Sequence, residues 1–567
     1  MSAGGLTQTW TVRKTEVKNP NTLIYETIGG PATMDPAWSY DTASSAVIFN
    51  VYETLVFYEG TSTEELKPQL ATEWEIEDNG LTYRFKIREG VKFHNGNTLT
   101  PSDVEYSIER AMVYDRSGGP SWMLLEPLLD VHSTRGGDGM KVSFENIDQA
   151  VEVQDQWVVF HLKESYAPFM QVLCHSVASI MDQEWATQQG AWPGTAETWE
   201  NYNNPGEPVL EDMNGTGPFE FDRWEHGNQV VLTRNDDYRR EPADLERVKM
   251  KYIDEWTTRK LEFLAGDADM IYVPRSHIGE LEDTKGIEVY KNLPTLQTTS
   301  LFFTMNIAED SQWIGSGKLD GEGIPPDFFS DKHVRKAFAN SFDYQTFIES
   351  ALQGEGKQIP GPVPSGMPYF NSEAGKYSFD LELAEKHFKQ AYGGSVEDPG
   401  PVWEEGFKMQ ILYNTGNTTR RIASNILKDK VESINNKFEV EVVDRKWSTF
   451  LNELVGMSLP LYAIGWLADY ADPHNFAYPH MHSQGTFSGF QGYENEYVDD
   501  LIMEGIRTTD PEERQEIYYE LQRIYHEEAI SIPIAQPLGR HYQREWVNGW
   551  YYNPIYSGPY FYTIWKG

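Results

Sequence analysis

Asp469 and Asp472 lie three residues apart in the segment GWLADYADPHNF (465–476), which continues an apolar run beginning LPLYAI. A carboxylate here can be a catalytic acid or base, a metal ligand, an anchor for a ligand's cation or a turn residue. Close spacing does not favour a glycosidase, whose paired carboxylates usually lie far apart in sequence, and the same holds for Asp267 and Asp269. The segment alone leaves the four interpretations open.

Three histidines, His474, His480 and His482, lie in and just after this segment, and the last two have the HxH spacing that can chelate nickel or zinc. No cysteine lies nearby, and Pro473 and Pro479 constrain the chain between them. Histidines in such a loop more often bind the backbone or solvent. We therefore predict neither a metal site nor a cofactor.

Common catalytic motifs are absent from the sequence, which has no GxSxG, HExxH, GxxxxGK[ST] or dinucleotide fingerprint. The single cysteine, Cys174, lies in the apolar run FMQVLCHSVASIM and cannot form an intramolecular disulfide. A small buried apolar role is the expected one. We predict that the chain is not an enzyme.

The composition excludes several classes of partner. The 567 residues carry 47 Lys and Arg against 87 Asp and Glu, a formal net charge of −40, and so negative a field disfavours nucleic acids and anionic membrane surfaces. No apolar run is long enough for a transmembrane helix, and the start, MSAGGLTQTW, lacks the regions of a signal peptide. The 17 Trp, 32 Tyr and 27 Phe leave a surplus beyond the core that can line a pocket.

Short strands and amphipathic helices alternate along the chain. ATEWEIEDNGLTYRFKIREGVKF alternates around its Asn-Gly pair, as β-hairpins do. A helix over 99–112 follows, with Thr100 as N-cap and Asp103 as the capping-box acid. A second pair of the same kind, a β-hairpin segment followed by a helix, is predicted from VQDQWVVFHLK and APFMQVLCHSVASIM.

Later segments continue the pattern. Two strands are predicted over 215–235, a helix ending at Gly266, a long helix over 333–352 and another over 510–529. FKMQILYNTG, NTTRRIASNILKDKVESI and KFEVEVVDRKW have the spacing of a parallel strand-helix-strand unit. Together the segments indicate an α/β fold with additional hairpins.

The order of these segments resembles the extracellular solute-binding proteins of the oligopeptide, dipeptide and nickel class, which deliver ligands to ABC importers. The segment PQLATEWEIEDNGLTYRFKIREGVKFHNGNTLTPSDVEYSIERAM is similar to that family's signature block, and Met34-Asp35-Pro36 to its early turn. NGTGPFEFDRW, LTRNDDYRR, GPVPSGMPYF, KWSTFL, GWLADYADPHNF and IPIAQP continue the match. The resemblance covers essentially residues 23–565.

The resemblance implies a type II periplasmic-binding-protein fold, with two α/β lobes joined by a two-strand hinge and an extra domain attached to the first lobe. A ligand would be enclosed between the lobes as they close. Transferred to this chain, lobe I comprises residues 1–50, 181–296 and 535–567. The extra domain comprises 51–180, and lobe II comprises 297–534.

The resemblance also implies an answer for Asp469. In peptide-binding relatives the acid three residues after the Gly-Trp pair holds the ligand's α-ammonium, and a carboxylate in a closed cleft strengthens such a bond. The backbone of Gly465, Trp466 and Leu467 would pair with the peptide as an added strand. Trp447 of KWSTFL, together with Trp466, would wall the pocket.

Three further positions lie on segments that face the cleft in relatives. They are Tyr272 in DADMIYVP, Phe303 in LFFTMN and, from the extra domain, Trp122. We expect these aromatic side chains to contact the ligand.

One position departs from the family pattern. Where an oligopeptide-binding relative has an arginine two residues before the Gly-Trp pair, this chain has Ala463. A peptide's carboxylate therefore needs another partner, for which Arg275 and Arg445 are candidates. Relatives that bind cello- or manno-oligosaccharides use tryptophan platforms, so an oligosaccharide ligand remains an alternative, as do a metal chelate and a sensing role.

We therefore predict a monomeric receptor that captures short peptides and delivers them to the permease of an ABC importer. Family members carry an export signal or a lipid anchor at the start. The protein is expected to be extracytoplasmic, with its targeting segment removed from this sequence.

Overall fold

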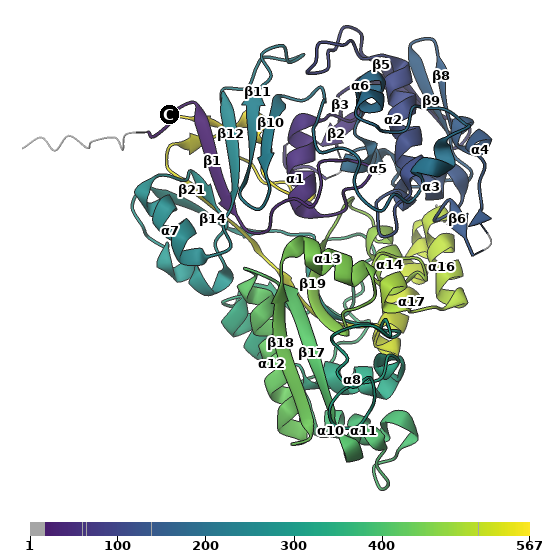
Figure 1. Cartoon of the computed structure of the whole chain (residues 1–567), viewed down its shortest axis with the longest axis vertical. Coiled ribbons are helices and arrows are strands. Elements are labelled where there is room, and N and C mark those ends of the chain that lie inside the picture. The colour runs from purple at the N-terminus through teal and green to yellow at the C-terminus, as the bar shows by residue number, and fades with distance from the viewer. Residues whose placement is uncertain (1–16, 59, 64, 138, 509) are drawn as a thin grey trace, which may run out of the picture.

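A computed structural model describes residues 17–58, 60–63, 65–137, 139–508 and 510–567. The start, which we interpreted as trimmed, lies outside these residues. Three sheets organise the described chain: one of seven strands, one of six and one of four (Figure 1). No helix in the described ranges combines the length and apolarity needed to cross a bilayer.

The seven-stranded sheet is mixed, because β1 pairs in parallel with β12 and β13 whereas its other pairings are antiparallel. Its strands, in spatial order, are β10 (Phe219–Glu225), β11 (Gln229–Arg234), β12 (Arg247–Tyr252), β1 (Thr22–Thr27), β13 (Met270–Ile271), β21 (Gly539–Arg544) and β14 (Ile287–Leu293).

The six-stranded sheet forms the centre of the second lobe. Its strands, in spatial order, are β16 (Gly356–Lys357), β20 (Ser531–Pro537), β15 (Gln297–Phe303), β19 (Leu461–Leu467), β17 (Phe407–Asn414) and β18 (Phe438–Arg445). The parallel β17–α12–β18 unit, with α12 at Thr418–Ile434, confirms the strand-helix-strand prediction. Figure 1 shows α12 along this sheet, below the seven-stranded one.

The four-stranded sheet lies at the upper right of Figure 1, apart from the other two. Its strands are β4 (Ala71–Glu77), β5 (Thr82–Ile87), β9 (Trp157–His161) and β8 (Val151–Gln154). The longer helices of the chain are α1 (Thr42–Val51), α2 (Pro101–Tyr114), α3 (Trp122–Leu129), α7 (Trp256–Ala265), α8 (Lys332–Ser341), α10 (Leu381–Gln390), α13 (Trp447–Val455), α14 (His474–Met481), α16 (Glu496–Arg507) and α17 (Pro511–Glu528).

The chain passes between the two large sheets twice. It leaves β14 at Leu293 and enters β15 at Gln297, and it returns from Pro537 of β20 to Gly539 of β21. These two adjacent crossings form the two-strand hinge of a two-lobed fold. Residues far apart in the sequence therefore line the two sides of one cleft.

Most predicted elements are confirmed. The hairpin is β4–β5, and α2 has the capping box of Thr100 and Asp103. Helix α7 ends where Gly266 adopts a left-handed backbone (φ 77°), which only glycine adopts without strain. Helix α17 begins after Asp510, whose side chain accepts two backbone N–H bonds.

Two helix predictions are wrong. The helix over 333–352 breaks at Phe342, whose backbone is extended (ψ 124°), and continues as short turns to Ala351. In APFMQVLCHSVASIM only Phe169–Val172 is α-helical, because the buried side chains face a core on several sides rather than along one stripe. Cys174 is buried there, as expected.

Candidate functional site

Two cavities lie side by side between the lobes. The hinge cavity, about 420 Å³, is lined by the crossing residues Thr295, Pro537 and Leu538. The outer cavity, about 370 Å³, is lined by Asp469 and by residues of α13. Both are within the size range of small-ligand sites. They form one cleft because they share the lining residues Thr42, Gln297, Arg420, Trp447 and Ser557.

Asp469 lies in the outer cavity just after the end of β19, with 13% of its side chain exposed. The hydroxyl of Tyr40 and the amide of Asn475 both donate to its Oδ2, at 3.1 and 2.8 Å, and Nε2 of His175 lies 3.4 Å from its Oδ1. Burial and the neighbouring Asp469 carboxylate raise the pKa of Tyr40 well above its usual value, so Tyr40 remains a donor. The carboxylate is thus held in place with a face toward the cavity.

Gly465, Trp466 and Leu467 form the end of β19 and line the same cavity. From Ala463 to Leu467 this strand pairs with β15 on one side only, since its pairing with β17 involves Leu461 and Tyr462. Among the described strands, none pairs with the other edge of this stretch. An extended ligand backbone can add there as a further strand.

The close approach of β15 to β19 requires a glycine at position 465. A Cβ at this position would lie 2.5 Å from the carbonyl oxygen of Thr298 and 3.7 Å from Nη2 of Arg420. A larger residue would therefore disturb the β15–β19 pairing and the position of this guanidinium.

The two tryptophans of the outer cavity are held by hydrogen bonds. Nε1 of Trp466 donates to Asn475 at 3.2 Å, and the ring meets Tyr40 edge-on. Nε1 of Trp447 donates across the cleft to Asp41 at 3.3 Å, and Trp447 lines both cavities. Both side chains line the cleft, and Trp466 is also part of the buried apolar cluster that includes Ile464 and Phe487.

The remaining aromatic candidates have different positions. Tyr272 lines the hinge cavity, and burial raises its pKa. Trp122 lies behind the site: its Nε1 donates to the hydroxyl of Tyr40 at 3.1 Å, and its ring stacks on Tyr478. A ligand contact is not supported for Trp122, which instead positions the tyrosine that binds Asp469.

Phe303 does not line either cavity. It is fully buried at the far end of β15 from the hinge, against Phe329 and Phe338. Its segment does reach the cleft, but through Gln297 and Thr299 at the other end of the strand. Phe303 shares its strand face with Gln297 and Thr299, but its place at the other end of β15 puts it in the core of the second lobe.

Arg420 was not among the residues predicted from the sequence. This residue, in the first turn of α12, lines both cavities and donates to Asn414 at 2.7 Å. Within the described part of the chain, no acidic side chain forms an ion pair with it. Burial lowers its pKa to about 10. Its position in the sequence was a usable signal. The start of a helix that follows a parallel strand commonly faces the ligand crevice of an α/β sheet.

Both arginines proposed earlier for the ligand carboxylate have acidic partners, although Arg275 shares the carboxylate of Glu355 with Arg540. Arg275 lines the hinge cavity but forms an ion pair with Glu355. Arg445 does not line either cavity and binds Glu453 at 2.6 Å. Arg420 is the better placed cation.

The three histidines considered for metal binding have separate partners. His474 contacts Glu126 of α3, His480 lies 2.8 Å from the carbonyl of Phe476, and His482 accepts the amide of Gln484. They do not converge on one point, and in the described ranges no group of three potential ligands does. The metal-chelating interpretation of this HxH pair is not supported.

Acidification is expected to destabilise the contact between the segments that follow α3 and α14. It does so through His132 and His482, whose ring centroids are 4.1 Å apart. Burial lowers the pKa of each to about 3, so the folded state favours the neutral rings. Their stabilisation is present above the ordinary pKa of about 6.5 and is lost as pH falls toward 3. From pH 7.5 to 5.5 each histidine should cost about 1.4 kcal/mol.

Urea unfolding at the two pH values tests this expectation. His132→Gln should lose less stability on acidification than the unsubstituted protein, by about 1.4 kcal/mol. Equal losses in the two proteins would contradict the role of this ring pair.

Sequence comparison assigns most of the chain to one family. The family described as "Bacterial extracellular solute-binding proteins, family 5 Middle" matches residues 65–488. The heme-binding protein A of Haemophilus influenzae is 27% identical over 541 residues, covering 93% of this chain and 89% of that protein. The probable D,D-dipeptide-binding periplasmic protein DdpA of Escherichia coli is 24% identical, covering 94% and 92%.

Solved structures show the same fold. The periplasmic binding protein DppA of Helicobacter pylori, in complex with the peptide STSA, superposes with a TM-score of 0.78 at 23% identity, covering 96% of this chain and 98% of that one. The dipeptide binding protein of a Pseudoalteromonas species, in complex with Met-Leu, gives a TM-score of 0.76 at 22% identity, covering 96% and 100%.

Proposed function

Because the chain belongs to the bacterial extracellular solute-binding proteins of family 5, we propose that it is the ligand-binding receptor of an ABC importer. It captures short peptides between its two lobes and delivers them to the membrane permease. Its role is binding rather than catalysis.

One observation carries this proposal: a buried carboxylate, Asp469, and a cation with no acidic partner among the described residues, Arg420, both line the outer cavity near the end of β19. Asp469 follows β19, and the guanidinium of Arg420 lies beside Gly465 of that strand. A peptide whose ammonium meets Asp469 and whose carboxylate meets Arg420 would place its backbone along Gly465–Leu467. Each end gains a charge-assisted bond in a cleft with little water.

The spacing supports a ligand of a few residues. A strand rises roughly 3.3 Å per residue, so the stretch from Gly465 to just past Leu467 is matched by a short extended peptide. A neutral oligosaccharide could stack on Trp447 and Trp466, but it would supply no opposite charge to Asp469 or Arg420, which is unfavourable in a closed cleft. The charges therefore favour a zwitterion over the sugar.

The wider assignment follows from the same proposal. The proposed boundaries are residues 1–50, 181–296 and 535–567 for lobe I, 51–180 for the extra domain and 297–534 for lobe II. Residues 1–16 lie outside the described chain, and β20 of the six-stranded sheet extends to Pro537, three residues into the range given for lobe I. The protein acts as a monomer outside the cytoplasm, and its surface meets permease subunits when the lobes are closed.

Native mass spectrometry of the purified protein, followed by denaturing extraction, tests the ligand class. Bound masses that resolve into peptides of a few residues with varied side chains would support main-chain recognition. A ladder of hexose masses, or tight binding only of added oligosaccharide, would overturn the peptide assignment.

A further inference from the structure

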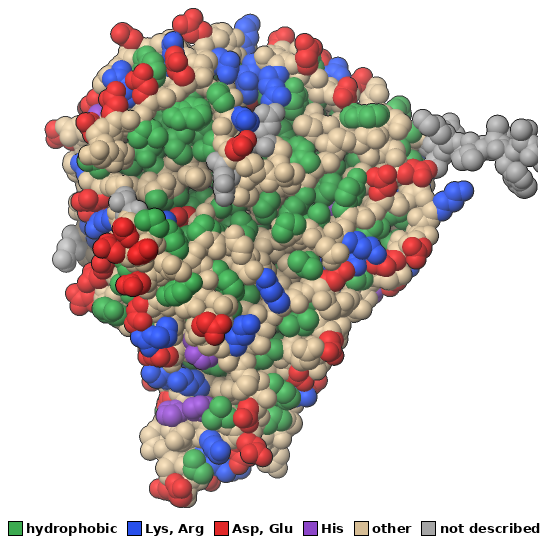
Figure 2. All heavy atoms as spheres, turned by 180° about the vertical axis from the view of Figure 1, so that it is seen from behind, with side chains coloured by type: hydrophobic (Ala, Val, Ile, Leu, Met, Phe, Trp, Pro, Cys, Tyr) green, Lys and Arg blue, Asp and Glu red, His purple; other side chains and the backbone are tan. Residues whose placement is uncertain are grey.

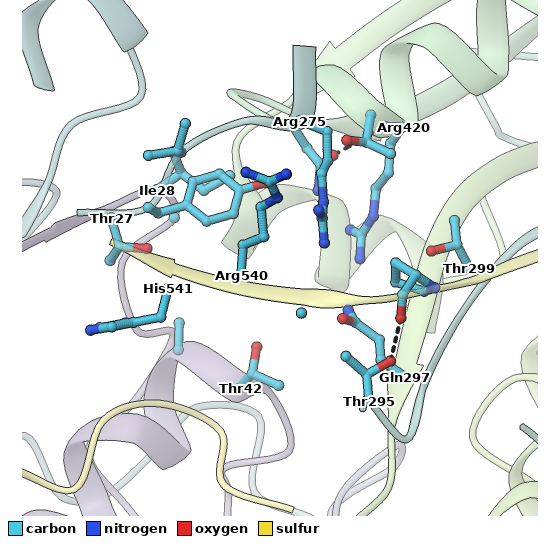
Figure 3. A pocket seen from close by; sticks show the side chains of 18 of the residues that line it. Thr27, Ile28, Thr42, Arg275, Thr295, Gln297, Thr299, Arg420, Arg540 and His541 are labelled. Carbon is cyan, nitrogen blue, oxygen red and sulfur yellow. Dashed lines mark hydrogen bonds between the residues drawn. The ribbon is translucent and has the colours of Figure 1, made fainter. Parts of the chain in front are cut away.

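The hinge cavity has a strongly positive lining. Figure 3 shows Arg275, Arg420 and Arg540 directed into it from three different elements, with Gln297 and several threonines around them. None of the described residues that line this cavity is acidic. A positive cavity is unexpected in this chain, whose net charge is −40. On the face shown in Figure 2, acidic side chains gather along the edges.

The carboxylates behind the cavity do not neutralise these arginines. Arg275 and Arg540 share the carboxylate of Glu355, to which Nε of Arg540 donates at 2.6 Å. Arg540 also contacts Glu282, but that acid pairs with Lys291 as well. The positive groups in this network are those of Arg275, Arg540 and Lys291, and the negative groups are those of Glu355 and Glu282. Three positive charges thus face two negative ones, which leaves one positive charge without compensation.

Arg420 adds a second uncompensated charge at the same place. Tyr272 lines the same cavity as Arg275 and Arg420. His541 also lines the cavity, but burial lowers its pKa to about 3, so the ring is neutral and adds no charge. The cluster of Tyr272, Arg275, Arg420 and Arg540 therefore suits two anionic groups rather than one.

We propose that the hinge cavity is a subsite for a second anionic group, so that the preferred ligands are short peptides with an acidic C-terminal residue. Arg420 binds the α-carboxylate, and Arg275 with Arg540 binds the side-chain carboxylate. This inference rests on the proposed peptide-binding function. The volume of about 420 Å³ exceeds what one carboxylate needs and leaves room for the acidic side chain and bound water.

The test compares ligands that differ only in this charge. Isothermal titration measures the affinity of Ala-Glu against Ala-Gln and of Ala-Ala-Glu against Ala-Ala-Gln. The acidic member of each pair should bind about 10 to 100-fold more tightly, the range expected for a charge-assisted bond. Equal affinities, or tighter binding of the glutamine peptides, would overturn this inference alone. Binding of none of the four would overturn the proposed function with it.

Two variants locate the effect. Arg275→Gln and Arg540→Gln should each reduce the preference for the glutamate peptide toward one, while the affinity for the glutamine peptide changes little. Arg445→Gln is the matched control, since Arg445 forms the same kind of ion pair with Glu453 outside both cavities and should leave the preference unchanged. Thermal melting confirms that each variant is folded. If folded Arg275→Gln and Arg540→Gln both keep the full preference for the glutamate peptide, the proposed acidic subsite is contradicted.

Discussion

Asp469→Asn is expected to weaken the binding of a zwitterionic peptide by at least about 100-fold, which corresponds to about 3 kcal/mol. The substitution keeps the shape and an acceptor for the Tyr40 hydroxyl and the Asn475 amide, both of which bind the present carboxylate. It removes the negative charge, so the ligand's ammonium would be enclosed without a counter-charge. Such an uncompensated ion costs several kcal/mol in a closed cleft.

Isothermal titration with a peptide and its desamino analogue isolates this effect. The analogue lacks the ammonium, so its affinity should be nearly the same for Asp469→Asn and the unsubstituted protein. The melting temperature should also change little, because the hydrogen bonds to Tyr40 and Asn475 persist. An undiminished peptide affinity in the folded variant would falsify the anchoring role of Asp469.

Much of the fold could be predicted from local patterns. The Asn-Gly hairpin, the capped helix α2 and the β17–α12–β18 unit follow from turn chemistry, capping and periodicity, and each is present. The single helix over 333–352 is interrupted at Phe342, where Asp343 caps a new turn by accepting the backbone N–H of Thr346 at 3.1 Å. The amphipathic pattern continues through this position, since Phe342 and Phe347 are both fully buried, and so it does not reveal the break.

The candidate site, too, could be predicted only in part from the sequence. The cleft positions of Asp469, Trp466 and Trp447 follow from ordered motifs, whereas the burial of Phe303 depends on which end of β15 reaches the hinge. The start of α12 could have indicated Arg420 from the sequence, but only the three-dimensional structure shows that this residue has no acidic partner among the described residues. Arg275 has the same residue type on the same cavity, yet it is paired with Glu355.

The loop over 32–41 shows how the early Met-Asp-Pro segment supports this site. Asp35 is fully buried and binds Arg110 of α2 through both guanidinium nitrogens, at 2.8 and 2.5 Å. Its Oδ1 also accepts the amide of Ala37 at 3.0 Å. The same loop carries Tyr40, which binds Asp469, so this ion pair connects α2 to the wall of the outer cavity.

Asp35→Asn is therefore expected to destabilise the protein by about 3–5 kcal/mol, because it leaves the guanidinium of Arg110 buried without its counter-charge. Urea unfolding provides the measurement, with Asp267→Asn as the matched control. Asp267 also forms an ion pair, with Lys18 at 2.8 Å, but the two side chains are 57% and 48% exposed, and exposed pairs contribute at most about 1 kcal/mol. If both variants lost equally little stability, the buried pair would not be what fixes the loop, and the position of Tyr40 beside Asp469 would depend on Trp122 instead.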